Sequence, residues 1–133
     1  MQIETEDIAY RDGDARLTGF LAFDATRTGK RPGVLVVHGG AGLDDHAKGR
    51  ARRLAALGYV ALACDMYGEG VPGNRQRIME AIAGLRSDPR RLTGRGQAGV
   101  DVLKTHPQVD GRIAAVGYCF GGMAVLEMAR QGA

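Results

Sequence analysis

The sequence opens with two stretches in which apolar and polar residues alternate. Residues 2–10 read QIETEDIAY, residues 15–23 read ARLTGFLAF, and the four residues between them read RDGD. Alternation with a period of two is typical of strands that bury one face. Asp-Gly is a favoured dipeptide in the tight turn between two paired strands. The pattern therefore predicts an N-terminal β-hairpin.

Further along the chain the alternation gives way to continuous apolar runs. GVLVVHGG (residues 33–40) and YVALACD (59–65) are typical of strands that are buried on both faces. RIAAVGY (112–118) follows an Asp-Gly turn and is a third predicted strand. Apolar residues at helical spacing predict helices that start at Asp44 or Asp45, run over 74–86 and 90–105, and start again at Phe120.

This order predicts an α/β fold of three layers, in which helices cover both faces of a mostly parallel sheet that follows the hairpin. No linker or repeat divides the 133 residues, so residues 1–133 are expected to belong to one domain. The carboxyl ends of strands in such a sheet open onto one edge, where ligands bind. HGGAG, CDMYGEG and GYCFGG would meet at that edge, and we expect the functional site there.

Composition adds few constraints to this picture. Hydrophobic residues make up 44% and charged residues 25% of the chain, as in ordinary globular proteins. The net charge of +3 is spread among 15 acidic residues, so we expect no nucleic-acid partner. The N-terminus resembles no targeting signal and no apolar run is long enough to span a membrane, so we expect a cytoplasmic protein without membrane contact. No histidines and carboxylates have the spacing of metal ligands, and we expect no metal site.

The strongest chemical signal is the sequence Gly117-x-Cys119-x-Gly121, which matches a nucleophile elbow with cysteine in place of serine. In an elbow the nucleophile occupies a strained turn between strand and helix, and we expect Gly117, Gly121 and Gly122 to leave room for the crossing backbone. The helix dipole would favour the ionised thiol. The amide of Phe120 would point the same way and bind an oxyanion. The alternative is a glycine-rich turn that merely carries a buried cysteine.

A second glycine loop, His38-Gly39-Gly40, ends an earlier strand and could supply the other oxyanion donor, the Gly40 amide. We interpret His38 as a structural residue whose ring is tied to neighbouring backbone rather than as a base. His46 and His106 have the sequence context of surface positions.

Cys64 lacks a glycine elbow and is interpreted as a small core residue. If one strand separates the strands of Cys64 and Cys119, the two cysteines lie about 10 Å apart. That exceeds the limit of roughly 7 Å for a disulfide. We therefore expect two free thiols.

Two segments together, PGVLVVHGGAGLDDHAKGRARRLAALGYVALACDMYGEG and VDGRIAAVGYCFGGMAVLEMAR, resemble the dienelactone hydrolase family. That family has the α/β-hydrolase fold and a Cys-His-Asp triad. The resemblance implies hydrolysis of small carboxylic esters or lactones through an acyl-cysteine, without a cofactor. It implies Cys119 as the nucleophile and the amides of Gly40 and Phe120 as the oxyanion hole.

Two positions depart from the family pattern. Gly39 stands where the best-known members have a glutamate that helps to ionise the cysteine. Glu69 stands where an arginine holds the substrate carboxylate, and a carboxylate there would repel an anionic lactone. Arg75 and Arg77 are candidates to compensate as substrate-binding residues, although a solvated helix surface is the alternative explanation for them.

A third departure concerns the residues after Cys119, which include neither Asp nor His. The resemblance therefore implies the N-terminal part of a hydrolase, an incomplete domain truncated after the elbow helix and weak or inactive by itself. The elbow strand would then be an exposed sheet edge that favours self-association. The alternatives are a non-catalytic pseudo-hydrolase that binds a small acyl ligand or a partner, and a dimer in which His38 of one copy serves the cysteine of the other.

Overall fold

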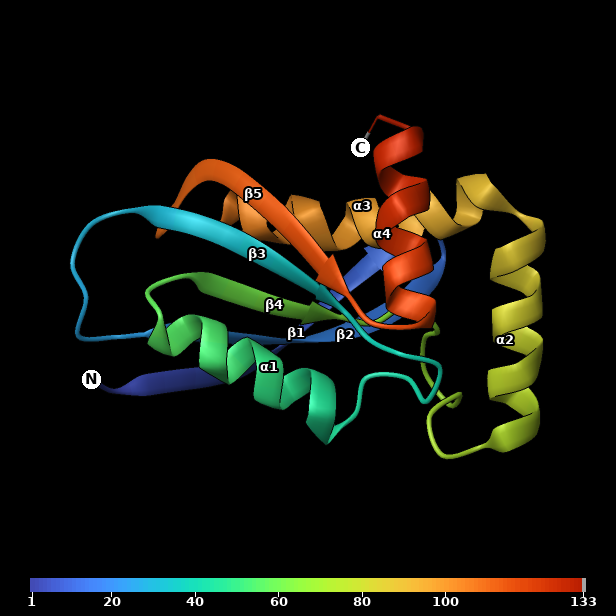
Figure 1. The fold of residues 1–133 in the computed structure, drawn as a ribbon. Coiled ribbons are helices and arrows are strands. Elements are labelled where there is room, and N and C mark those ends of the chain that lie inside the picture. The colour runs from blue at the N-terminus through green and yellow to red at the C-terminus, as the bar shows by residue number, and fades with distance from the viewer. Residues whose placement is uncertain (133) are drawn as a thin grey trace.

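The computed structural model describes residues 1–132 of the chain (Figure 1). This part contains five strands and four helices, in the order predicted from the sequence. The strands are β1 (Ile3–Asp12), β2 (Ala15–Asp24), β3 (Arg31–Val37), β4 (Val60–Cys64) and β5 (Val109–Gly117). The helices are α1 (Asp45–Ala56), α2 (Arg75–Ser87), α3 (Pro89–Thr105) and α4 (Phe120–Arg130).

Three of the four helices begin at a side chain that caps them. The side chains of Asp44, Asn74 and Asp88 each accept a hydrogen bond from a backbone N–H in the first turn, at 3.1–3.2 Å. Such caps satisfy donors that the helix itself cannot pair. Helix α4 differs, because Cys119 at its N-cap position makes no side-chain capping bond. The first turn of α4 therefore has no side-chain acceptor for its N–H groups.

The five strands form one sheet in the order β1-β2-β4-β3-β5. β3 lies parallel to both β4 and β5, whereas β2 lies antiparallel to both β1 and β4. The sheet is thus mixed, because the hairpin joins the parallel part through an antiparallel pairing. β3 separates β4 from β5, as expected, and β5 is an edge strand.

Helices cover both faces of the sheet, which confirms the predicted three layers. Figure 1 shows α1 on one face and α3 and α4 on the other. Neighbouring residues of β3 alternate between the two layers, since Val36 packs with Ala51 of α1 while Leu35 and Val37 pack with Leu103 of α3 and other residues of that side. Both sides of β3 are therefore apolar, as its continuous apolar run predicted.

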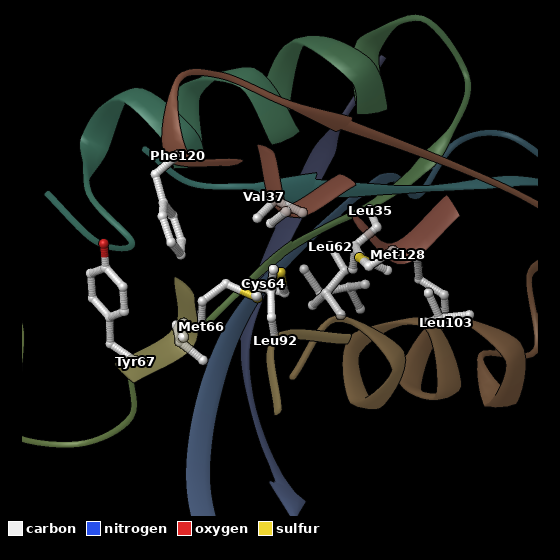
Figure 2. Close-up of a cluster of buried hydrophobic side chains, with 14 of the residues drawn as sticks. Leu35, Val37, Leu62, Cys64, Met66, Tyr67, Leu92, Leu103, Phe120 and Met128 are labelled. Atoms are coloured by element: carbon white, nitrogen blue, oxygen red, sulfur yellow. The ribbon is translucent and has the colours of Figure 1, made fainter. Parts of the chain in front are cut away.

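Glycines let α3 pack closely against its neighbours. A Cβ atom added at Gly96 would collide with the side chain of Met128, and one at Gly99 would lie 2.8 Å from Leu35 Cδ1. Figure 2 shows Leu35, Leu103 and Met128 in this core, together with the labelled residues from the sheet and from α4. The close packing places α3 directly beneath β3 and β4.

An ion pair connects α3 to the hairpin. Nη1 of Arg95 donates to the Asp12 carboxylate at 2.7 Å, and the Arg95 side chain is buried. The pair joins residues that are 83 positions apart in the sequence. It therefore ties the start of the chain to the helical layer.

No helix in residues 1–132 is both long enough and apolar enough to cross a membrane.

Candidate active site

The loops that follow β3, β4 and β5 meet at one edge of the sheet, as the sequence predicted. Tyr67, which follows β4, donates a hydrogen bond from its hydroxyl to the Gly40 carbonyl at 2.8 Å. Its ring lies 4.7 Å from the His38 ring and 5.6 Å from the Phe120 ring, measured between centroids. Figure 2 shows Tyr67 and Phe120 side by side at the end of the core. One aromatic cluster thus holds the three loops together.

Cys119 occupies the turn from β5 into α4 and is exposed. Its backbone dihedrals are φ 54° and ψ −114°, and it is the only non-glycine residue with positive φ in the described part of the chain. Side chains rarely adopt this region, and such strain costs on the order of 1–3 kcal/mol. Strain combined with exposure is the geometry expected of a nucleophile elbow. The alternative of a buried cysteine in this turn is wrong.

Two of the three elbow glycines are required by close backbone contacts. A Cβ atom at Gly117 would collide with the backbone of Gly121, and a Cβ atom at Gly121 would collide with the carbonyl of Val37. The prediction for Gly122 is wrong, because a Cβ atom there would lie 3.5 Å from its nearest neighbour, the Gly117 carbonyl oxygen. That distance is an ordinary van der Waals contact, so only Gly117 and Gly121 make room for the turn.

His38 is buried, and both of its ring nitrogens are engaged. Nε2 accepts a hydrogen bond from the Met66 amide at 3.0 Å, so the ring proton lies on Nδ1 and is donated to the Gly39 carbonyl at 2.7 Å. Burial lowers the pKa of His38, which favours the neutral ring. These contacts confirm that the ring is tied to neighbouring backbone. They also exclude His38 as a base for a second copy of the chain.

The hydrogen bonds of His38 fix the orientation of the peptide that joins Gly39 to Gly40. The Gly39 carbonyl accepts from His38 Nδ1 and also from the Gly42 amide at 3.1 Å. Because a trans peptide is planar, its N–H points away from its carbonyl. The Gly40 N–H therefore points away from the His38 ring. No loop or turn acceptor in residues 1–132 takes a hydrogen bond from it.

The Phe120 amide is a second free donor. It belongs to the first turn of α4, where the helix supplies no acceptor. The next two bonds of the turn run from the Gly121 amide to the Tyr118 carbonyl at 2.9 Å and from the Met123 amide to the Cys119 carbonyl at 3.1 Å. These bonds hold the turn while the Phe120 N–H, directly after Cys119, stays available for a ligand.

Sequence reasoning missed the part played by Asp65 and Tyr67. The buried Asp65 carboxylate accepts from the amides of Tyr67 and Gly68, each at 3.0 Å, and from the Thr18 amide at 3.3 Å. It thereby fixes the turn that carries Tyr67, whose hydroxyl holds the Gly40 loop. The segment CDMYGEG at a strand end indicated a turn of this kind, but not its hydrogen-bond partners.

Cys64 is buried and free, and Cys119 is also free, as expected. Burial raises the pKa of the Cys64 thiol to about 12. A thiol of this kind is inert at neutral pH. Among residues 1–132, no cluster of histidine, cysteine, aspartate or glutamate side chains could hold a metal ion.

The structure does not place the three substrate-binding candidates in a hollow with Cys119. Glu69 is exposed and lines shallow hollows with residues of β1 and β2 and the loops near them. Arg75 and Arg77 lie on the exposed first turn of α2, where Arg77 Nη1 donates to the Gly70 carbonyl at 3.1 Å. Arg77 also lines a cavity between α2 and α3 whose lining does not include Cys119.

Comparisons with known proteins bear on the family and the fold. The model of the dienelactone hydrolase family matches residues 17–133. A Bradyrhizobium sp. protein named a probable 2-oxo-3-(5-oxofuran-2-ylidene)propanoate lactonase is 33% identical, over 90% of this chain and 48% of its own length. P91, described as a dienelactone hydrolase-like promiscuous phosphotriesterase from metagenomic libraries, is 42% identical with a TM-score of 0.95, over 100% of this chain and 56% of that one. The structure named m3DLH is also 42% identical, with a TM-score of 0.93 over 98% of this chain and 55% of that one. The chain thus spans about half the length of these relatives.

Proposed function

Because the chain belongs to the dienelactone hydrolase family, we propose that it carries the nucleophile and the oxyanion-binding amides of an enzyme that hydrolyses carboxylic esters or lactones. Cys119 is the nucleophile, and the N–H groups of Gly40 and Phe120 form the oxyanion hole. The substrate is a small molecule, and no cofactor takes part. The observation that carries the proposal is the strained, exposed position of Cys119 between a strand end and an uncapped helix.

In the first step the Cys119 sulfur, as thiolate, attacks the carbonyl carbon of the ester, and the electron pair of the C=O bond moves to the oxygen. The resulting oxyanion accepts hydrogen bonds from the two amides, which stabilise the charge as it develops. Collapse of this intermediate breaks the bond to the alkoxide oxygen, which takes a proton, and leaves a thioester on Cys119. Water then attacks the thioester and releases the carboxylic acid and the thiol.

The second step needs a positioned proton acceptor, and no histidine in residues 1–132 hydrogen-bonds to Cys119. Of the three histidines, His38 uses both ring nitrogens, and the residues after Cys119 contain neither aspartate nor histidine. We propose that this chain by itself is acylated at Cys119 but turns over slowly. General base catalysis typically contributes 10²–10⁴-fold, so turnover is expected to be slower than acylation by a factor of that order.

The test is a burst experiment with p-nitrophenyl acetate. We expect release of about one equivalent of p-nitrophenol per chain, followed by a much slower steady state, and an acetyl group on the peptide that contains Cys119. Cys119→Ala removes the burst, whereas Cys64→Ala, the matched control, keeps it because Cys64 is buried. Equal rates for wild type and Cys119→Ala would contradict the proposal.

A second candidate is a non-catalytic module that binds a small acyl ligand. Two features of the sequence favour it. Gly39 leaves no carboxylate next to His38, and the residues after Cys119 include neither aspartate nor histidine. The same experiment separates the two functions, because a binding module gives no acetylated Cys119. A binding module would still retain a carboxylate product, with an affinity that does not depend on the sulfur.

We further propose that the edge of β5 mediates self-association and that the protein works in the cytoplasm without a nucleic-acid partner. β5 pairs only with β3, so a row of its backbone groups is unpaired. Two free cysteines are usual in a reducing compartment.

A further inference from the structure

A cavity of about 340 Å³ lies between α2 and α3, and Cys119 is not among its lining residues. Its size is within the range of small-molecule sites, which is about 300–1,000 Å³. Its floor is formed by Met66, Tyr67 and Leu85, which are all buried. Neither Cys119 nor Gly40 lines it. The cavity is therefore distinct from the proposed catalytic site, although both contact Tyr67.

Positive charge predominates in the lining of this cavity. Arg77, Arg91 and Arg95 line it, and Glu80 is the one carboxylate among the lining residues. The Arg91 guanidinium makes no ion pair within residues 1–132, and the Arg77 guanidinium is bonded there only to the Gly70 carbonyl. The Glu80 carboxylate accepts from the Gln76 side-chain amide at 3.3 Å. Two guanidinium groups without an ion pair, those of Arg77 and Arg91, thus line the cavity beside Arg95, which is paired with Asp12.

Among the three arginines of the cavity, Arg95 is the buried one, with 6% of its surface exposed. Its Nη1 donates to Asp12 at 2.7 Å, its Nε is sealed from solvent without a partner, and no partner for Nη2 is present in residues 1–132. A buried guanidinium with unused donors is costly, and protein interiors normally supply an acceptor. A ligand in the cavity cannot reach the sealed Nε, but it can reach Nη2, which is not among the sealed atoms and has no partner in residues 1–132.

Gly84 leaves the space for such an acceptor open. It lies inside α2, where glycine weakens a helix, and it lines the cavity. A Cβ atom at Gly84 would have as its nearest neighbour Arg91 Nη1, at 3.8 Å. A side chain at this position is thus sterically allowed and would project toward the arginine. A larger residue here would fill the cavity without disturbing the backbone.

We propose that the cavity between α2 and α3 binds a small organic carboxylate with a short apolar body. The carboxylate pairs with the guanidinium groups of Arg91 and Arg95, because planar guanidinium and carboxylate groups form paired hydrogen bonds. The apolar body lies on Met66 and Leu85. A neutral analogue lacks the charge, and inorganic phosphate lacks the apolar body, so both should bind more weakly.

The first test is calorimetric titration of the whole chain with benzoate, benzamide and inorganic phosphate. We expect benzoate to bind at least about tenfold more tightly than benzamide or phosphate, and its affinity to fall as sodium chloride is added. Cys119→Ala should bind benzoate like the wild type. Equal binding of benzoate and benzamide, or loss of benzoate binding in Cys119→Ala, would overturn the proposal. Neither result depends on whether Cys119 is acylated.

The second test compares neighbouring arginines of α3. Arg91→Gln should weaken benzoate binding about tenfold. Arg90→Gln, the matched control, removes the same charge from the same helix turn but not from the cavity lining, and should change binding less than twofold. Gly84→Leu should abolish binding while the helix is kept. Equal losses for Arg90→Gln and Arg91→Gln, or full binding by Gly84→Leu, would show that benzoate binds elsewhere.

Discussion

At the scale of single residues, glycines that touch backbone decide the shape of the elbow. The spacing Gly117-x-Cys119-x-Gly121 predicted the turn, because the contacts that require these two glycines lie within the turn or on the adjacent strand. Gly122 has the same sequence context but no such contact, so its role was predicted wrongly. The bond of the His38 ring to neighbouring backbone was predicted, but its second partner was not, because the Met66 amide lies 28 residues away. Outside a recognised motif such as the elbow, contacts that are distant in the sequence leave no local pattern.

The glycine contacts give a prediction with an internal control. Gly117→Ala and Gly121→Ala should each destabilise the fold by at least about 3 kcal/mol, or prevent folding, because a Cβ atom collides with backbone that cannot move aside. Gly122→Ala should leave stability unchanged or raise it by up to about 1 kcal/mol, because alanine favours a helix. Urea unfolding of the three variants measures the difference, and equal effects would contradict the assignment.

The buried His38 gives a prediction about pH. Burial lowers its pKa from the ordinary 6.5, so below about pH 6.5 the unfolded chain binds more protons than the folded chain. The stabilisation that comes from keeping the ring neutral is fully present above that pH. It is lost as the pH falls toward the pKa of His38 in the folded chain. Urea unfolding at pH 7.5 and 5.5 should show this loss, and His38→Gln should reduce it. His106, whose pKa is lowered by burial and by Arg31, adds a loss of the same sign. Greater stability at pH 5.5 would contradict the prediction.

At the scale of helices and strands, the sequence predicted every element, because each has a local cause. Apolar spacing marked the helices, and Asp44, Asn74 and Asp88 cap three of them. These patterns do not predict where an element lies in the sheet or how exposed it is. The run RIAAVGY predicted the strand β5, but the exposed edge position seen at Arg112 and Ala114 was expected from the family resemblance and not from the run itself.

The exposed edge of β5 predicts concentration-dependent self-association. Sedimentation of the wild type should show dimers or larger species as concentration rises. Ala114→Lys should shift the protein toward monomer, because a lysine on an edge strand opposes pairing with another strand. Ala114 is exposed, so the fold should be unaffected, which circular dichroism checks. Identical association of the two proteins would show that β5 is not the interface.

At the scale of the whole molecule, the predicted layers and the position of β3 between β4 and β5 are confirmed. Strand alternation and the usual order of such sheets were enough for that prediction. The link between the hairpin and α3, and the cavity between α2 and α3, were not predicted. The link and the cavity both depend on Arg95, which lies in the segment LTGRGQAG. The apolar spacing around this segment predicted only a helix. Its burial follows from how the layers pack.

The link between Arg95 and Asp12 is testable by removing one charge. Asp12→Asn leaves a buried guanidinium without its carboxylate and should lower stability by about 2 kcal/mol, less than for a fully buried pair because Asp12 is 28% exposed. Asp110→Asn is the control, because its partner Arg112 is 76% exposed and an exposed ion pair contributes little, so the loss should be much smaller. Thermal unfolding of both variants measures the two effects. Equal shifts would mean that the hairpin is held by other contacts.

The positive φ of Cys119 lowers stability at the residue that we propose as the nucleophile. Glycine adopts that conformation without strain, so Cys119→Gly should relieve the turn, although greater freedom of the unfolded chain offsets part of the gain. If the sulfur is the nucleophile, the protein keeps it although it lowers the free energy of unfolding. A population of variants screened only for resistance to heat should lose the cysteine, and one screened for ester cleavage should keep it.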